Sequence, residues 1–301
     1  MMRQPSGSEA SLSERLFATL QSWLPTRALS AFMFRVAQVR NPAFKNALMR
    51  WFMHKYAVEL GEAEFHRVED YEHFNAFFTR ALKPGMRPQP AAPNLFSSPV
   101  DGAISQFGPI RQGRIFQAKG HEYSAAELLA DDLLAHSFYS GSFNTIYLAP
   151  HNYHRVHMPC SGRLRNWAYV PGRLFSVNPG TARSVPGLFA RNERMVAVFD
   201  TAFGPMALVM VGAVIVGGIE TVWNGRLTPP HLRKVRPTYY EPMHPVVLER
   251  GDELGRFHLG STVIVLAPQG ALNWNTNLSA GREVRLGESL ATIVKKGEVF
   301  A

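Results

Sequence analysis

The stretch Leu259-Gly260-Ser261-Thr262 decides the fold and the chemistry expected of this chain, and the apolar run 263–266 follows it directly. A serine after a glycine, leading into β-branched residues, predicts a turn that enters a buried strand. Glycine also tolerates strained backbone at little cost, so the same stretch suits a chain that cleaves itself. In that interpretation the Ser261 hydroxyl attacks the Gly260 carbonyl, and elimination then leaves a pyruvoyl group at a new N-terminus. A ketone of this kind is an electron sink, as an added cofactor is in other enzymes.

The chain around this stretch has the composition of a folded protein with a sizeable core. Of its 301 residues, 46% are hydrophobic, and this length allows one large domain or a domain with an appendage. Residues 125–134 predict a helix within a body that is otherwise rich in strands. The strands are predicted where β-branched and aromatic runs alternate with Gly and Pro, at residues 102–107, 143–148, 163–170, 195–199, 207–216, 246–248 and 261–266.

The N-terminal part of the chain predicts helices. Residues 11–57 hold seven Lys or Arg side chains against one acid, Glu14, and apolar residues recur there at helical spacing. Because Pro25 and Pro42 divide the segment, we predict three short amphipathic helices, and a further helix over 68–81. Basic amphipathic helices with Trp and Phe suit the interface of a bilayer, whereas their apolar faces can also pack on the main domain. The helices can contact both the membrane and the main domain if different helix faces make the two contacts.

The predicted fold class is α+β, with N-terminal amphipathic helices over residues 1–65 followed by a β-rich catalytic domain over residues 66–301. A formal net charge of +9 and a sequence pI near 9.9 suit a polyanionic partner, either nucleic acid or acidic lipid. No nucleic-acid-binding motif accompanies this charge, which favours a lipid surface. Residues 206–219 are the most apolar stretch, but they are too few to span a bilayer as a helix, and no signal peptide is evident. The single cysteine, Cys160, excludes an intrachain disulfide.

Two further motifs supply an acid and two imidazoles. Asp101 stands in a turn before Gly102, and His154 and His157 stand three residues apart in Tyr153-His154-Arg155-Val156-His157-Met158-Pro159. On a helix such a pair of histidines is half of a metal site, but Pro150 and Pro159 argue against a helix here. On an extended segment a spacing of three points the two side chains to opposite faces. We therefore predict separate tasks for the two histidines and no metal.

Taken in order, these motifs resemble those of the phosphatidylserine decarboxylases, in their shorter, bacterial membrane-bound form. The resemblance covers most of the chain, and it includes the blocks Phe74-Asn75-Ala76-Phe77-Phe78-Thr79-Arg80, Leu82-Lys83-Pro84-Gly85, Phe175-Ser176-Val177-Asn178, Leu188-Phe189-Ala190-Arg191-Asn192-Glu193-Arg194 and Gly217-Gly218-Ile219-Glu220-Thr221-Val222-Trp223.

The resemblance implies a role for each candidate residue. Ser261 would become a covalent pyruvoyl cofactor and the Schiff-base site for the substrate amine, after cleavage of the Gly260–Ser261 bond. His157 would take the proton from Ser261 during self-cleavage, with Asp101 behind it as the acid of a charge relay. His154 would serve the decarboxylation itself. An imidazole suits both tasks because its ordinary pKa lies near 6.5.

The resemblance also implies the substrate and the partners. Phosphatidylserine would be converted to phosphatidylethanolamine by a large chain 1–260 that stays paired with a small chain 261–301, and two such pairs would form a homodimer. The expected location is the cell membrane, peripheral and on its cytoplasmic face, against an anionic surface. Three alternatives remain open on the residues alone: a serine hydrolase with an intact chain, a pyruvoyl-dependent decarboxylase of a free amino acid, and a lipid- or nucleic-acid-binding module without catalysis.

Overall fold

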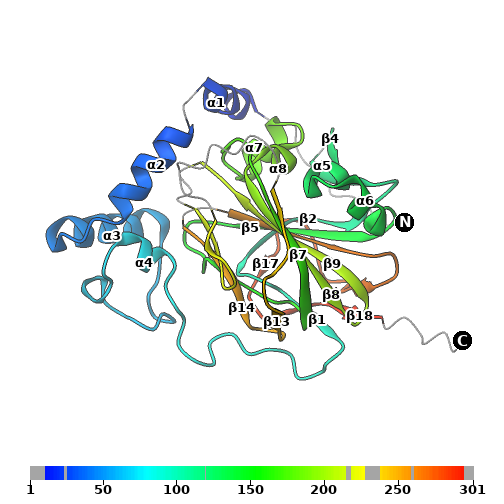
Figure 1. The fold of residues 1–301 in the computed structure, drawn as a ribbon. Coiled ribbons are helices and arrows are strands. Elements are labelled where there is room, and N and C mark those ends of the chain that lie inside the picture. The colour runs from blue at the N-terminus through cyan, green and yellow to red at the C-terminus, as the bar shows by residue number, and fades with distance from the viewer. Residues whose placement is uncertain are drawn as a thin grey trace, which may run out of the picture.

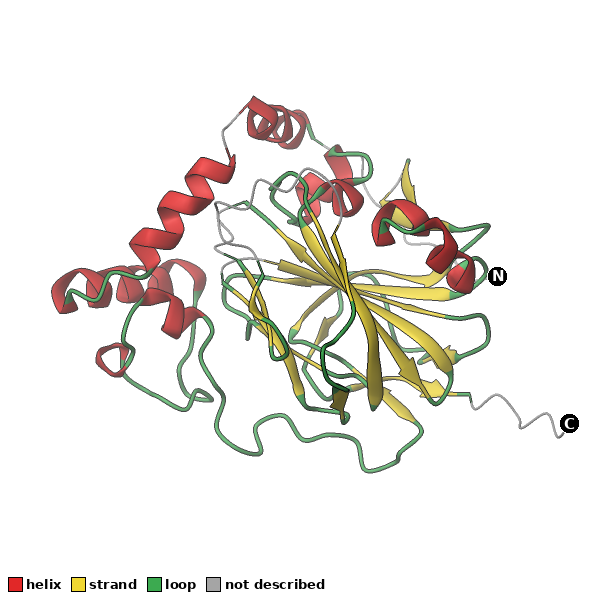
Figure 2. Cartoon of the chain, viewed as in Figure 1, coloured by secondary structure: helices red, strands yellow, loops and turns green. Residues whose placement is uncertain are grey.

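The structure is a computed structural model that describes residues 11–23, 26–118, 120–214, 218–227, 238–258 and 261–294. Helices dominate its N-terminal part and strands dominate the rest, so the predicted α+β class is confirmed (Figure 1). Figure 2 shows the helices gathered around the outside of a strand-rich body. The N-terminal helices are α1 (Leu12–Trp23), α2 (Thr26–Ala37), α3 (Pro42–Tyr56), η1 (Val68–Asp70) and α4 (Phe74–Phe78).

The largest sheet is antiparallel and has β15 near its middle, between β9 and β5. Its order is β12-β7-β8-β9-β15-β5-β2-β17, with β13 paired to β7. The strands are β2 (Gly102–Pro109), β5 (Ser142–Leu148), β7 (Gly162–Val170), β8 (Arg194–Thr201), β9 (Gly204–Gly212), β12 (Thr238–Tyr240), β13 (Val247–Leu248), β15 (Ser261–Ala267) and β17 (Glu283–Val284).

Every residue of β15 is buried, because both faces of the sheet are covered. Val263 and Val265 belong to one hydrophobic core, whereas Ile264 and Leu266 belong to the core on the opposite face. This period-two division explains why the strand reads as a continuous apolar run rather than as an alternating one. Ser261 has the same parity as Val263, so its side chain lies on the face of the first core.

Smaller sheets cover that first face. One has the order β11-β10-β14-β6 and one has the order β1-β18-β16, whereas the pair β3-β4 places Ile115 and Tyr123 in the core on the opposite face. Val156, Ile219, Leu254 and Phe257 of the four-stranded sheet contribute to the same core as Val263. The strands are β1 (Leu95–Ser97), β3 (Arg114–Ala118), β4 (His121–Ser124), β6 (Arg155–His157), β10 (Ile219–Thr221), β11 (Gly225–Arg226), β14 (Glu253–Phe257), β16 (Leu272–Trp274) and β18 (Ser289–Ile293).

Short helices and α1 cover the other face. The helix predicted over 125–134 is broken in two, because Ala130 adopts a left-handed conformation with a φ of 55° and Asp131 then caps a new helix. The helices on this side are α5 (Ala125–Leu129), α6 (Asp132–Ala135), η2 (His136–Phe138), α7 (Pro179–Ser184) and α8 (Leu188–Arg191).

The helix predicted over 68–81 is also shorter than expected. The Lys45 ammonium donates to the carbonyls of Val68 and Glu69, at 3.4 and 3.2 Å, and Tyr71 is extended, with a φ of −87° and a ψ of 132°, which ends the short helix η1. Regular α-helix therefore begins only at Phe74, where the His73 side chain caps the amide of Ala76. The aromatic residues of this segment still form a core, as predicted, together with α3.

Helix α1 uses two different faces. Its polar and small side holds the body: Glu14 pairs with Arg183 of α7, Gln21 accepts a hydrogen bond from the Ser176 amide at 2.6 Å, and Ala18 is buried. Its large apolar side points outward, with Leu16 71% and Trp23 84% exposed. None of the helices within the described residues is both long and apolar enough to span a membrane.

Candidate active site

Ser261 opens the central strand in a fully buried position. It lies opposite Leu148 of β5 on one side and Gly212 of β9 on the other, and none of its surface is exposed. Among the described residues its hydroxyl oxygen has no hydrogen-bond partner. The two residues before it, Leu259 and Gly260, lie outside the described residues. A buried hydroxyl without a partner is costly in a native protein, and the hydroxyls of Thr262, next to it, and of Thr145 on β5 share this feature.

The loop that carries His154 leaves the sheet beside Ser261. Strand β5 ends at Leu148, directly opposite Ser261, so residues 149–154 begin at the entrance to β15. The His154 imidazole is fully buried and lies against the ring of Phe78. The backbone carbonyl of His154 accepts a hydrogen bond from the Phe257 amide at 3.0 Å. Neither ring nitrogen makes a hydrogen bond within the described part of the chain, although the carbonyls of Pro150 and Ala149 lie near enough to stabilise the charged ring slightly.

Burial decides the charge of His154. Desolvation of the ring, with a smaller contribution from the positive Arg80, lowers its pKa to about 3. The imidazole is therefore neutral at physiological pH and has one nitrogen that can accept a proton.

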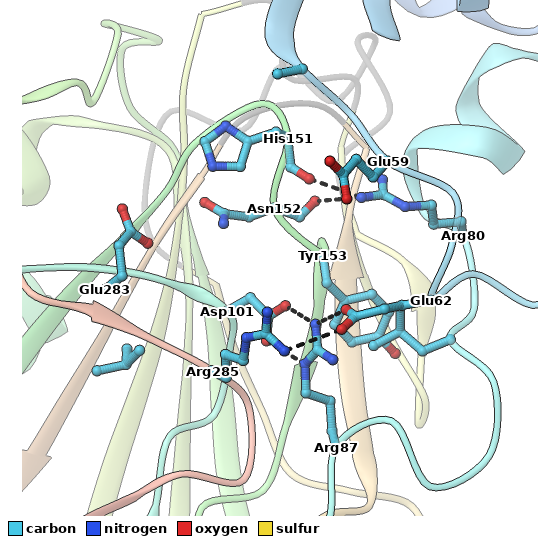
Figure 3. A pocket seen from close by; sticks show the side chains of 13 residues that line it. Glu59, Glu62, Arg80, Arg87, Asp101, His151, Asn152, Tyr153, Glu283 and Arg285 are labelled. Carbon is cyan, nitrogen blue, oxygen red and sulfur yellow. Dashed lines mark hydrogen bonds and ion pairs between the residues drawn. The ribbon is translucent and has the colours of Figure 1, made fainter.

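Helix α4 and the residues after it hold the His154 loop in place. The Arg80 guanidinium donates to the carbonyl of His151 at 2.8 Å, as Figure 3 shows, and Arg155 donates to the carbonyl of Thr79 at 2.9 Å. Two stretches that are about 70 residues apart in sequence thereby form one structural unit. This explains why the blocks 74–80 and 153–159 occur together as motifs.

His157 lies on β6 in the tautomer that a general base needs. Its Nδ1 lies 2.7 Å from the Gly251 carbonyl, which can only accept, so Nδ1 carries the proton. Its Nε2 then accepts a hydrogen bond from the Tyr153 hydroxyl at 3.1 Å. Burial lowers the pKa of His157 below its ordinary value, so the ring is neutral near pH 7 and its Nε2 lone pair is available to take a proton.

Asp101 is held by an arginine. Its carboxylate accepts hydrogen bonds from Arg87 Nε at 2.9 Å and Nη2 at 2.5 Å, and from the Leu286 amide at 2.8 Å. The hydrogen bonds to Asp101 and to Glu62 raise the pKa of Arg87 further. Figure 3 shows this cluster at the edge of a cavity of about 480 Å³, and Arg80, His151, Asn152 and Tyr153 also line it.

The predicted site residues thus have separate partners, and of the four only Asp101 lines the cavity. The negative charge of Asp101 reaches His157 through space and acts to raise the pKa of that imidazole. Within the described residues, no hydrogen bond joins Asp101 to His157 or His157 to Ser261. Asp101 and His157 are bonded to other groups, and the Ser261 hydroxyl has no partner there. The charge relay therefore stays a prediction.

Several residues that hold or border the predicted site residues were not predicted from the sequence. Arg87, which binds Asp101, follows a motif block without belonging to it, and Tyr153 was noted only as a neighbour of His154. His258 is buried between Asn75 and Glu220, three residues before Ser261. Both partners stand in motif blocks, but nothing in the sequence connects them to His258.

The residues present fit a cofactor that is made from the chain. The unpartnered Ser261 oxygen and the unpartnered His154 nitrogens lie at the same end of the central sheet, in surroundings without water-exposed surface. Such surroundings favour a reactive carbonyl, because polar interactions are stronger where water is excluded. Within the described ranges, no group of three or more His, Cys, Asp or Glu side chains is placed to hold a metal ion.

Comparison with known proteins finds relatives over most of the chain. A family model described as phosphatidylserine decarboxylase matches residues 74–292, and a model described as PSD matches residues 16–57. The phosphatidylserine decarboxylase proenzyme of Pseudomonas fluorescens is 54% identical over 282 residues, which are 93% of this chain and 98% of that protein. The proenzyme of the same name from Pseudomonas putida is 53% identical over 287 residues, covering 94% of this chain and all of the relative.

These matches define the chain as a decarboxylase, so the prediction of an enzyme of this class is confirmed. More narrowly, the chain belongs to the phosphatidylserine decarboxylase family.

Proposed function

We propose that this chain decarboxylates phosphatidylserine to phosphatidylethanolamine, at a pyruvoyl group made from Ser261 by autocatalytic serinolysis of the Gly260–Ser261 bond. The observation that carries the proposal is the buried, unpartnered Ser261 hydroxyl at the start of the central strand, in a chain of this family. A serine hydrolase would keep an intact chain and a free Ser261 hydroxyl, so cleavage of the chain distinguishes the two functions.

The first step of self-cleavage moves the Gly260 acyl group from nitrogen to oxygen. The Ser261 oxygen attacks the Gly260 carbonyl, its proton passes to a base, and the C–N bond breaks to give an ester and a free amine. We assign the base to His157, because its Nδ1 proton is fixed on the Gly251 carbonyl and its Nε2 lone pair is free to accept a proton once Tyr153 gives way. The nearby charge of Asp101 stabilises the imidazolium that forms.

The second step breaks the ester by elimination. A base removes the α-proton of Ser261, and the Gly260 carboxylate leaves from the β-carbon, so residue 261 becomes dehydroalanine. Its tautomer, an imine, takes up one water and releases ammonia, which leaves a pyruvoyl group on the small chain 261–301 and a free carboxylate on the large chain 1–260. Strand β15 pairs with β5 along its full length and with β9 from Ser261 to Leu266, and these pairings keep the two chains together.

A pyruvoyl ketone condenses with a primary amine and accepts the electron pair that remains when CO₂ departs. We assign His154 to the decarboxylation step, where its neutral imidazole binds the substrate or returns a proton to it. The Phe78 ring and the backbone contacts of Arg80 keep that imidazole in place. A positioned acid or base of this kind contributes roughly 10²- to 10⁴-fold to the rate.

The N-terminal helices supply the contact with the membrane in this proposal. The outward face of α1 is apolar while its other face holds the body, so this helix can insert its exposed side chains without giving up its docking contacts. Apolar residues on α2 and α3 are exposed as well, among them Phe32, Phe44 and Trp51. Together with the net charge of +9, these helices suit a peripheral site on an anionic bilayer. The cytoplasmic face and the homodimer stay predictions.

The direct test is decarboxylation of phosphatidylserine that carries a labelled carboxyl group, presented in mixed vesicles. We expect labelled CO₂ and phosphatidylethanolamine in equal amounts from the wild-type chain, and neither from Ser261→Ala. If fully cleaved wild-type protein releases no CO₂ from this lipid but does so from free serine, the substrate assignment is wrong.

A further inference from the structure

His258 is a buried imidazole with a partner for each ring nitrogen. Its Nε2 donates to the Glu220 carboxylate at 2.8 Å, and its Nδ1 accepts the Asn75 amide at 2.6 Å. The hydrogen bond from His258 holds the pKa of Glu220 below its usual range, so this carboxylate is charged. The partners come from α4 and β10, so the ring joins two elements that are remote in sequence.

The backbone on either side of this ring is fixed too. The His258 amide donates to the Gly218 carbonyl at 2.9 Å, and the Phe257 amide donates to the His154 carbonyl at 3.0 Å. On the other side of the cleavage site, Ser261 is held in β15 between Leu148 and Gly212. The bond that must be cleaved thus lies between two anchored positions that are three residues apart.

An anchored segment of this length limits where the Gly260 carbonyl can be relative to the Ser261 oxygen. Attack requires the two atoms to come within about 3–3.5 Å in a suitable direction, and an error of about 1 Å can cost about 10²-fold in rate. Within the described part of the chain, the imidazole of His258 is the side-chain anchor nearest in sequence to the bond on its upstream side. Both of its ring nitrogens are taken by Asn75 and Glu220, so the ring acts through the position of the chain.

We propose that His258 is a positioning residue for self-cleavage, because its imidazole, held between Asn75 and Glu220, fixes the chain three residues before Ser261. This inference rests on the proposed function. It assigns no role to His258 in the decarboxylation that follows, which takes place after the anchored segment has become a chain end.

The role of His258 can be tested with four substitutions, three at His258 and one at Glu220. His258→Gln places an amide nitrogen where Nε2 lies and keeps the bond to Glu220, whereas His258→Asn keeps a partner for Asn75. His258→Phe keeps a ring and loses both bonds. Glu220→Gln is nearly isosteric and removes the charge from the partner, so it supplies a variant that folds even if the changes at His258 do not.

The experiment follows cleavage of the full chain after synthesis. Each variant is labelled during a short cell-free translation, translation is stopped, and the fraction of uncut chain is measured over time. We expect His258→Phe to be cleaved about tenfold or more slowly than the wild type, with His258→Gln, His258→Asn and Glu220→Gln between the two. Once cleaved, each variant should decarboxylate at about the wild-type rate per pyruvoyl group.

Two further measurements separate positioning from stability. Hydroxylamine aminolyses an ester, so it converts the ester intermediate into a hydroxamate on Gly260 and a free amine on Ser261. If His258 positions the segment for attack, the variants should yield less of this trapped product at early times. The melting temperatures of uncut chains, each carrying Ser261→Ala with and without the change at His258, show whether the fold itself is affected.

The outcomes distinguish this inference from the proposed function. A wild-type chain that never cleaves contradicts the proposed function itself. If the wild-type chain cleaves and the His258→Phe and Glu220→Gln chains cleave equally fast, only the role of His258 is contradicted. The role is also wrong if slower cleavage follows a lower melting temperature and the trapped ester fraction is unchanged.

Discussion

The imidazole of His154 lies nearly parallel to the ring of Phe78, with 4.0 Å between the ring centroids and 24° between the ring planes. This contact covers one face of an imidazole whose two nitrogens have no hydrogen-bond partner among the described residues. The stacking fixes the plane of the ring, and with it the directions in which either nitrogen can exchange a proton. His154 is therefore oriented by packing, whereas His157 is oriented by hydrogen bonds.

Replacing His154 should separate the two stages of the reaction. We expect His154→Ala to cleave into two chains yet to decarboxylate about 100-fold more slowly, because a positioned proton carrier is lost. Phe78→Leu, which keeps the imidazole but removes the stacked ring, should give a smaller loss. Cleavage is read from denaturing gels and decarboxylation from CO₂ release per mole of cleaved protein. A His154→Ala chain with full decarboxylase activity would contradict the assignment.

The residues assigned to self-cleavage should behave differently. Ser261→Ala, His157→Ala and Asp101→Asn should each leave the chain largely uncut, since they remove the nucleophile, its base and the charge that stabilises the protonated base. Arg87→Gln is a useful control, because it removes the partner of Asp101 without removing the carboxylate. If Asp101 served only to bind Arg87, the two substitutions at this pair would slow cleavage equally.

The pH dependence of cleavage follows from the burial of His157. Cleavage needs the neutral ring, and burial lowers the pKa of His157 below its ordinary value of 6.5. The cleavage rate should therefore stay constant as the pH falls from 8 to 6.5 and decline only at more acidic pH. The rate constant is measured after translation is stopped and the extract is shifted to each pH. A decline centred above pH 6.5 would show that the base is not this imidazole in this environment.

The stability of the folded chain should depend on pH through His154. Its pKa is lowered from 6.5 to about 3 in the folded state, so below pH 6.5 the unfolded chain binds a proton that the folded chain does not. The free energy of unfolding should therefore fall as the pH falls through this window, by roughly 1 kcal/mol per pH unit. Denaturant unfolding of Ser261→Ala with and without His154→Leu isolates this contribution. An identical pH slope in the two proteins would mean that His154 is not buried as described.

Membrane binding should depend on the outward face of α1. We expect Leu16→Asp or Trp23→Asp to weaken binding to anionic vesicles at least about tenfold, because each places a charge where an apolar side chain would insert. Leu133→Asp on α6 is a matched control, since Leu133 is 82% exposed but lies outside the N-terminal helices. Vesicle flotation measures the bound fraction. Equal losses for all three variants would place the membrane contact elsewhere.

The sequence predicted the strand at Ser261 because a continuous apolar run with turn residues before it has few other solutions in a β-rich body. The continuous apolar run implied a strand that is covered on both faces. It did not show which strands lie on either side of it in the sheet. The helix over 68–81 was predicted too long, because the spacing of its aromatic residues is helical while Tyr71 is extended and Lys45 binds the carbonyls of Val68 and Glu69. A contact of that kind between distant residues carries no local signal.

In the candidate site, too, local motifs could be predicted from the sequence and contacts between distant residues could not. Ser261, His154 and His157 were predicted as site residues because they stand in compact motifs, and the motif blocks at 74–80 and 153–159 lie together as one unit. The binding of Asp101 by Arg87 and of His258 by Asn75 and Glu220 could not be predicted from spacing. Asn75 and His258 are 183 residues apart in sequence and meet only in the folded chain.

The most direct test of the account is the intact mass of the purified, denatured protein after incubation under native conditions. We predict two species, residues 1–260 and residues 261–301, and the smaller should carry the mass of a pyruvoyl group in place of Ser261. The Ser261→Ala chain should give one uncut species. A single unmodified mass for the wild-type protein would contradict self-cleavage, and with it the proposal that this decarboxylase makes its cofactor from Ser261.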